Sequence, residues 1–193
     1  MISIYDIFMK PLEKRGITKA RRELIPMAYG NVLEIGAGTG VNIKYYNMPL
    51  ISKLTLSDVA LSKKVKDIAS KDIFLTELNV EALPFDDNTF DVVIHTLVFC
   101  SVTDVSKGLA EIKRVLKPDG KLLFIEHVLP KRIGLKRFFK FINPAWRRIA
   151  SGCNLTREFE DSLSKQGFVF DTPTRFMKSA FISGVAKTEQ RNT

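Results

Sequence analysis

The sequence predicts a single α/β domain built around a mostly parallel β-sheet. From residue 31 to residue 128, short apolar runs alternate with stretches of helical periodicity, as strands and crossover helices do in such proteins. The first apolar run ends in a cluster of glycines. The run over residues 90–94 is nearly all apolar, which is typical of a strand covered on both faces. With 193 residues, the chain can bury a core without disulfides or a metal.

The predicted elements follow one another along the chain. Strands are expected at residues 32–35, 54–56, 73–75, 90–94 and 121–125, with two further candidates at 168–170 and 180–182. Helices are expected at residues 62–70 and 156–166, and from a cap at Thr103-Asp104 through Val115. Residues 117–120, Lys-Pro-Asp-Gly, have the chemistry of a turn. The first thirty residues are predicted to be helical, with Gly30 as a C-terminal stop.

Composition excludes several classes of protein. No apolar stretch approaches the ~18 residues of a membrane span, and the N-terminus lacks the basic segment and apolar core of a signal peptide. Cys100 and Cys153 lie far apart and form no CxxC unit, so we expect two small core residues in a reducing cytoplasm and no metal site. The net charge of +9 suits a polyanionic partner, either nucleic acid or an anionic membrane face.

The glycine cluster is the first candidate binding site. The run Glu34-Ile35-Gly36-Ala37-Gly38-Thr39-Gly40 ends the first strand, where open α/β sheets bind ligands. Glu34 is placed to meet a cationic part of a ligand. Asp58 follows the second strand, 22 residues after Gly36, where a carboxylate can accept hydrogen bonds from both hydroxyls of a ribose. The structural alternative for Asp58 is a helix N-cap.

Four motifs in order and at the right spacing carry a resemblance to a known family. Residues 32–40 resemble motif I of the class I S-adenosylmethionine-dependent methyltransferases. Residues 79–85 (NVEALPF), 90–93 (FDVV) and 114–122 (RVLKPDGKL) resemble segments of the ubiquinone/menaquinone methyltransferase-like branch, the methyltransferase domain 11 type. Residues 99–102, 125–128, 144–146 and 152–158 are similar to the membrane-associated thiol methyltransferases called methyltransferase-like proteins and to their bacterial relatives.

This resemblance implies a fold and a cofactor. The fold would be a Rossmann-like three-layer sandwich with a seven-stranded sheet in the order 3-2-1-4-5-7-6, the last strand antiparallel. The cofactor would be S-adenosyl-L-methionine, leaving S-adenosyl-L-homocysteine as product. The glycine turn would hold its methionine part, Asp58 its ribose, and Asn79 with Val80 its adenine, although the branch usually has Asp where this chain has Asn79. The residues expected at the cofactor are Tyr5 (in an N-terminal helical lid over residues 1–30), Glu34, Gly36, Ala37, Gly38, Asp58, Asn79, Val80, His95 and Thr96.

His127 is the candidate catalytic residue. It ends the fifth strand, on the functional edge of the sheet, and is expected to act as a base or as a substrate anchor. The structural alternative is a partly buried histidine bonded near Glu126. The predicted activity is methyl transfer to a small, lipophilic acceptor, with a thiol favoured over a phospholipid amine or a quinone precursor. An RNA methyltransferase and a non-catalytic nucleoside-binding protein are the remaining alternatives.

A basic, aromatic segment interrupts the alternation of strands and helices. Residues 131–148, within a predicted insertion at 131–150, carry seven Lys and Arg, no acid, and the aromatic side chains of Phe138, Phe139, Phe141 and Trp146. Such a mixture suits a lid over the site or a helix at an anionic membrane surface. It also suits phosphate contacts with base stacking, but nucleic acid is the least favoured of these partners.

Overall fold

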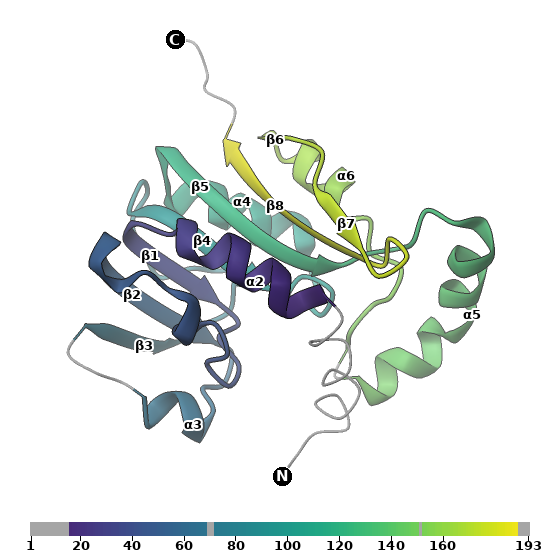
Figure 1. Ribbon diagram of the computed structural model, residues 1–193, viewed down its shortest axis with the longest axis horizontal. Coiled ribbons are helices and arrows are strands. Elements are labelled where there is room, and N and C mark those ends of the chain that lie inside the picture. Colours follow the sequence, from purple (N-terminus) through teal and green to yellow (C-terminus); the bar gives the residue numbers. More distant parts are fainter. Residues whose placement is uncertain (1–15, 69–71, 151, 189–193) are drawn as a thin grey trace.

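The computed structural model describes residues 16–68, 72–150 and 152–188, which form one mostly parallel sheet with helices on both faces (Figure 1). Its strands are β1 (Gly30–Ile35), β2 (Ile51–Asp58), β3 (Ile73–Glu77), β4 (Phe90–Thr96), β5 (Leu116–His127), β6 (Phe168–Phe170), β7 (Thr174–Phe176) and β8 (Phe181–Thr188). They lie in the order β3-β2-β1-β4-β5-β8-β6, with β7 paired to β8. β1 to β5 pair in parallel, and β8 is antiparallel to β5.

This topology confirms the expected Rossmann-like fold. With the three-residue β7 set aside, seven strands remain in the expected order and the last of them runs antiparallel. β7 was not predicted; it pairs with the first half of β8, while β6 pairs with the last residues of β8.

Helices complete the three layers. They are α2 (Thr18–Leu24), η2 (Ile25–Met27), η3 (Ile43–Tyr45), η4 (Met48–Leu50), α3 (Lys63–Lys66), α4 (Val105–Val115), α5 (Ile133–Ile149) and α6 (Phe159–Lys165). α2 covers one face of the sheet, and α4 and α6 cover the other (Figure 1). α5 lies beyond the carboxyl end of β5 (Figure 1).

The core consists of one apolar cluster on each face. Successive strand residues point to opposite faces, so Val32 packs with Leu24 of α2 while its neighbour Leu33 packs with Leu109 and Ile112 of α4. The half of the predicted N-terminal lid that the structure describes includes α2, whose Ala20 and Leu24 are buried. Residues 1–15 lie outside the described part of the chain.

Two local predictions need correction. Gly30 does not stop a helix: α2 and η2 end before it, and Gly30 begins β1 with φ +67, where an added Cβ would lie 2.4 Å from Oδ2 of Asp91. Residues 117–120 form no separate turn between α4 and β5. They bulge within β5, because Leu116 pairs with Phe90 and Lys121 already pairs with Val92.

Candidate functional site

The glycine turn leaves β1 in left-handed conformations that favour glycine. Gly36 has φ +71, and a Cβ there would lie 2.3 Å from Cγ2 of Val98, so no other residue fits against the loop that follows β4. Gly38 has φ +55, and a Cβ there would meet no atom within 4 Å. The N–H of Ala37, between them, donates to the carbonyl of Ser57 at 2.8 Å. The turn is therefore packed at Gly36 and open at Gly38, where a ligand has space.

Asp58 lies against this opening at the end of β2. Its Oδ2 accepts a hydrogen bond from the N–H of Gly38 at 2.9 Å, and its Oδ1 is 3.4 Å from the N–H of Ala60. The helix-cap alternative does not hold, because Ser62 is the N-cap of α3 and accepts from the N–H of Val65. The hydroxyl of Ser62 also donates to the carbonyl of Gly38 at 2.7 Å. β2 thus presents a carboxylate beside the second glycine of the turn, and its contact with a ribose stays a prediction.

Below the turn, Glu34 belongs to a buried polar cluster that sequence reasoning missed. Its carboxylate is 1% exposed and accepts from the amide of Asn42 at 2.8 Å and from the hydroxyl of Tyr46 at 2.6 Å. The guanidinium of Arg21 donates to the amide oxygen of Asn42 and, at 2.9 Å, to the hydroxyl of Thr96. Burial raises the pKa of Glu34, against the effect of these hydrogen bonds. The polar atoms of Glu34 and Thr96 are therefore held by protein partners, and their contact with a ligand stays a prediction.

Asn79 and Val80 lie in the loop after β3. Asn79 is exposed, and its side-chain oxygen accepts from the N–H of Glu81 at 3.0 Å, while the side chain of Val80 is buried. The carboxylate of Glu81 accepts from the N–H groups of Thr103 and Asp104 at 3.1 and 3.0 Å, just before α4. These bonds fix the loop to the start of α4.

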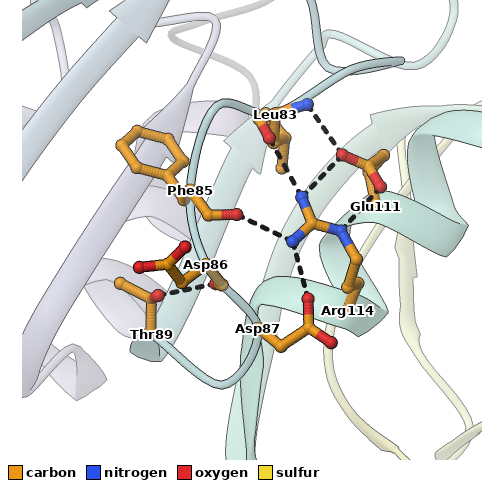
Figure 2. Close-up of polar contacts among 7 residues, drawn as sticks. All are labelled: Leu83, Phe85, Asp86, Asp87, Thr89, Glu111 and Arg114. Atoms are coloured by element: carbon orange, nitrogen blue, oxygen red, sulfur yellow. Dashed lines mark hydrogen bonds and ion pairs between the residues drawn. The ribbon is translucent and has the colours of Figure 1, made fainter.

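Arg114 of α4 holds the next part of the same loop (Figure 2). Its guanidinium donates to the carbonyls of Leu83 and Phe85 at 2.9 and 2.7 Å. It also pairs with the carboxylates of Glu111 and Asp87 at 2.8 Å. One side chain thus ties the loop from residue 83 to residue 87 to the helix.

His95, expected beside the cofactor, has its imidazole in the core. The ring is 0% exposed and lies 4.6 Å from the ring of Phe99, with Phe159 also in contact. Its Nδ1 lies 2.8 Å from Oε1 of Glu126, which also accepts from the N–H groups of Val98 and Phe99. Phe99 belongs to this core. The imidazole of His95 presents no open surface, so any contact that His95 makes with a ligand involves its backbone.

A cavity of about 310 Å³ lies at the carboxyl edge of the sheet, under α5. It is lined by Leu97, Cys100, His127, Leu135, Phe139, Ile142, Trp146, Cys153, Leu155, Met177, Lys178, Ala180 and Phe181. Among the described residues that line it, none is Asp or Glu, and Lys178 is the one Lys or Arg. The cavity therefore suits an apolar ligand and offers no partner to a cationic group.

His127 lies in the wall of this cavity. Its ring stacks on Phe139 at 5.7 Å and meets the ring of Phe181 edge-on at 5.1 Å. Burial lowers the pKa of His127 to about 4, and the carboxylate of Glu126 opposes this only in part. His127 is thus an uncharged imidazole at neutral pH.

α5 forms the roof of the cavity. Leu135, Phe139, Ile142 and Trp146 line the cavity, whereas Ile133, Phe138 and Phe141 are exposed on the outside, Phe141 at 84%. None of the residues of α5 is fully buried. The predicted insertion is therefore a helix with apolar side chains both toward the cavity and toward solvent.

The described residues contain no helix with the length and hydropathy of a membrane span. Within the same ranges, no group of three or more His, Cys, Asp or Glu side chains is arranged to hold a metal ion. Tyr5, predicted to contact the cofactor, lies outside the part of the chain that the structure describes.

Comparison of this sequence with known proteins finds methyltransferases among its relatives. Residues 33–124 match the sequence profile of a methyltransferase domain. The thiol S-methyltransferase TMT1B of Rattus norvegicus is 35% identical over an alignment of 146 residues, which covers 71% of this chain and 59% of that protein. TMT1B of Mus musculus is 35% identical over an alignment of 184 residues, which covers 85% of this chain and 75% of that protein. This chain thus spans about three fifths of the rat relative's length and three quarters of the mouse relative's length.

A solved structure shares the fold. The S-adenosylmethionine-dependent methyltransferase from Mesorhizobium loti superposes with a TM-score of 0.72 over 88% of this chain and 96% of that chain. The two sequences are 16% identical, so this likeness speaks for the fold alone.

Proposed function

This chain belongs to the family of S-adenosylmethionine-dependent methyltransferases, and on that premise we propose that it methylates small, lipophilic thiols. The observation that carries the proposal is the apolar cavity at the carboxyl edge of the sheet, whose described lining contains an uncharged imidazole and no carboxylate. The names of the rat and mouse relatives, both thiol S-methyltransferases, support the choice of a thiol.

The residues at the glycine turn fit the cofactor. The empty space next to Gly38 gives room for its methionine part, and the half-buried carboxylate of Asp58 has acceptor capacity left for ribose hydroxyls. The amide of Asn79 and the backbone N–H of Val80 are the proposed partners of the adenine. When bound, the cofactor supplies a sulfonium methyl group, whose transfer leaves an uncharged thioether.

The cavity favours a thiol over an amine for electrostatic reasons. A protonated amine would lose its water shell in an apolar cavity whose described lining offers no carboxylate, which is costly. A thiol enters uncharged and loses its proton as its sulfur bonds to the methyl carbon. The S–H group becomes strongly acidic during that step, so the uncharged ring of His127 is basic enough to accept the proton although its pKa is about 4.

A panel of acceptors tests this proposal. The purified chain is incubated with S-adenosylmethionine and one of three isosteres, an alkyl thiol, the matching alcohol or the matching amine, and methylated products are measured by mass spectrometry. We expect methylation of the thiol alone, with a rate that rises with the length of the alkyl chain until the cavity is filled. The variant His127→Phe keeps the aromatic packing and should lower kcat more than it raises KM. Equal methylation of the amine would contradict the proposal.

We also propose that the outer side of α5 contacts an anionic membrane surface. The exposed fractions of Ile133, Phe138 and Phe141 are 70%, 53% and 84%, and the segment 131–148 contains seven Lys and Arg and no acid. Aromatic side chains enter the headgroup region while neighbouring cations meet anionic lipid. A roof that touches lipid would admit lipophilic acceptors directly to the cavity beneath it.

Sedimentation with vesicles tests the contact. Binding should rise with the fraction of anionic lipid and fall with salt, and the variant Phe141→Ser should weaken it. The matched control is Phe74→Ser, because Phe74 is exposed at 49% on β3, an edge strand of the sheet that does not contribute to the cavity under α5. Equal binding to neutral and anionic vesicles, or equal loss in both variants, would refute a specific role of α5.

A further inference from the structure

Cys100 and Cys153, the two cysteines of the chain, lie close together although they are 53 positions apart in the sequence. The N–H of Asn154 donates to the carbonyl of Cys100 at 2.8 Å, and the two thiols are close enough to shift each other's pKa. Both side chains are buried in one small cluster with Ala150 and Leu155, and both line the cavity under α5. The sequence suggested two separate core residues, whereas the fold makes them one pair at the wall of a ligand cavity.

We propose that Cys100 and Cys153 form a redox-active dithiol that reacts with small apolar disulfides entering the cavity. The choice of ligand rests on the proposed function, because the disulfide form of a lipophilic thiol presents the same apolar groups to the same walls. Protein disulfides join Cα atoms roughly 4.4–6.8 Å apart. The backbone hydrogen bond from Asn154 to Cys100 brings the backbone next to Cys153 close to Cys100, as a disulfide between them requires.

The surroundings of the two thiols determine which of them attacks the disulfide first. The neighbouring side chains of Cys100 and Trp146 lower the pKa of Cys153, whereas the contact with Cys153 and burial raise the pKa of Cys100. Thiolates are the attacking species in disulfide exchange, so Cys153 attacks first.

The exchange balances in two steps. The Cys153 thiolate bonds to one sulfur of the disulfide, and the other sulfur leaves as a thiolate that takes up a proton. Cys100 then gives up its proton and attacks the Cys153 sulfur, and the second ligand sulfur leaves as a thiol. The protein loses two hydrogens, and one small disulfide is reduced to two thiols.

The product would join two parts of the cavity wall. Cys100 belongs to the loop after β4, and Cys153 follows the end of α5 at Ile149. A disulfide between them would fasten the C-terminal end of the roof to the sheet edge and remove two thiols from the lining. Oxidation is therefore expected to slow methyl transfer, and a reductant to restore it.

Intact mass spectrometry tests the dithiol without any acceptor. The folded chain is incubated with hydroxyethyl disulfide, the reaction is quenched with acid, and the mass of the intact protein is measured. The wild type should lose about 2 Da, the mass of two hydrogens. The variant Cys100→Ser should stop at one hydroxyethylthio adduct on Cys153, and Cys153→Ser should stay unmodified over the same time. The proposal would be overturned if the wild type carried two adducts, if the wild type did not react, or if both variants reacted equally. Urea-unfolded protein serves as the control that the reagent is active.

An activity measurement separates this proposal from the proposed function. If the mass changes occur but no thiol is methylated, the dithiol stands and the acceptor assignment fails. Where a thiol is methylated, the rate of the wild type should fall with the ratio of hydroxyethyl disulfide to mercaptoethanol and recover with dithiothreitol. The methylation rate of the double variant Cys100→Ser/Cys153→Ser should not change with that ratio, when it is compared with the rate of the same variant without disulfide. A change equal to that of the wild type would refute the role of the dithiol.

Discussion

At the scale of single residues, we expect substitution of Asp58 to have the clearest effect on cofactor binding, because of the position of its carboxylate. It lies 2.9 Å from the N–H of Gly38, next to the empty space at the glycine turn. We expect Asp58→Ala to weaken S-adenosylmethionine binding by about tenfold or more, because hydrogen bonds to a charged acceptor contribute about 1.5–3 kcal/mol. Isothermal titration calorimetry measures the change. Asp171→Ala, at an exposed position after β6, is the control, and unchanged affinity of the Asp58 variant would remove Asp58 from the site.

The lowered pKa of the buried His127 imidazole predicts that the stability of the folded chain depends on pH. The unfolded chain binds a proton on this imidazole below about pH 6.5, whereas the folded chain does so only near pH 4. Between these values the unfolded state holds more protons, so the free energy of unfolding falls as the pH falls, by about 3 kcal/mol in all. Urea unfolding of wild type and His127→Phe at pH 7 and pH 4.5 checks this. The free energy of unfolding of the variant, relative to that of the wild type, should be higher at pH 4.5 than at pH 7. A difference in free energy that does not change with pH would contradict the burial argument.

At the scale of elements, Arg114 joins the loop that follows β3 to α4 (Figure 2). Its planar guanidinium reaches two carbonyls of the loop and two carboxylates at once. A lysine keeps the charge but lacks this geometry. We expect Arg114→Lys to lower the free energy of unfolding by about 2 kcal/mol and to weaken cofactor binding, because Asn79 and Val80 lie in the same loop.

Chemical denaturation measures the first effect of Arg114→Lys and calorimetry the second. Arg22→Lys, at an exposed position of α2, should change the free energy of unfolding by less than about 0.5 kcal/mol. Equal stability of the two variants would show that the contacts of Arg114 contribute nothing to the folded state.

The elements that the sequence did not predict lack a local signal. β7 has three residues, too few for a periodic pattern, and the turn that follows it consists of Met177, Lys178 and Ser179, all with positive φ. Such conformations usually require glycine or asparagine, so nothing in the sequence marks a hairpin there. At Gly30 the signal was present but ambiguous. Glycine ends many helices, yet here it is required because Asp91 of the adjacent strand lies too close for a side chain.

At the scale of the whole molecule, the sequence predicted those site features that follow from topology. Asp58 and Gly38 meet because adjacent parallel strands end at the same edge of the sheet, and this depends only on strand order. The cluster around Glu34 depends on side chains from α2, from Asn42 and Tyr46 on either side of η3, and from the ends of β1 and β4, which no spacing rule connects. The contact between Cys100 and Cys153 was missed for the same reason, since it depends on how the chain after α5 returns to the sheet.

The identity of the ligand at the glycine turn can be tested on the folding equilibrium as a whole. A ligand that binds only the folded chain stabilises it by about 2.7 kcal/mol at a hundredfold excess over its Kd, which for a chain of this size raises Tm by about 5–11 °C. S-adenosylhomocysteine should produce such a rise, measured by scanning calorimetry at increasing concentration. NAD should produce none, because its pyrophosphate would lie next to the carboxylate of Asp58, which has no Lys or Arg among its described contacts. A larger rise with NAD would mean that the turn binds a dinucleotide.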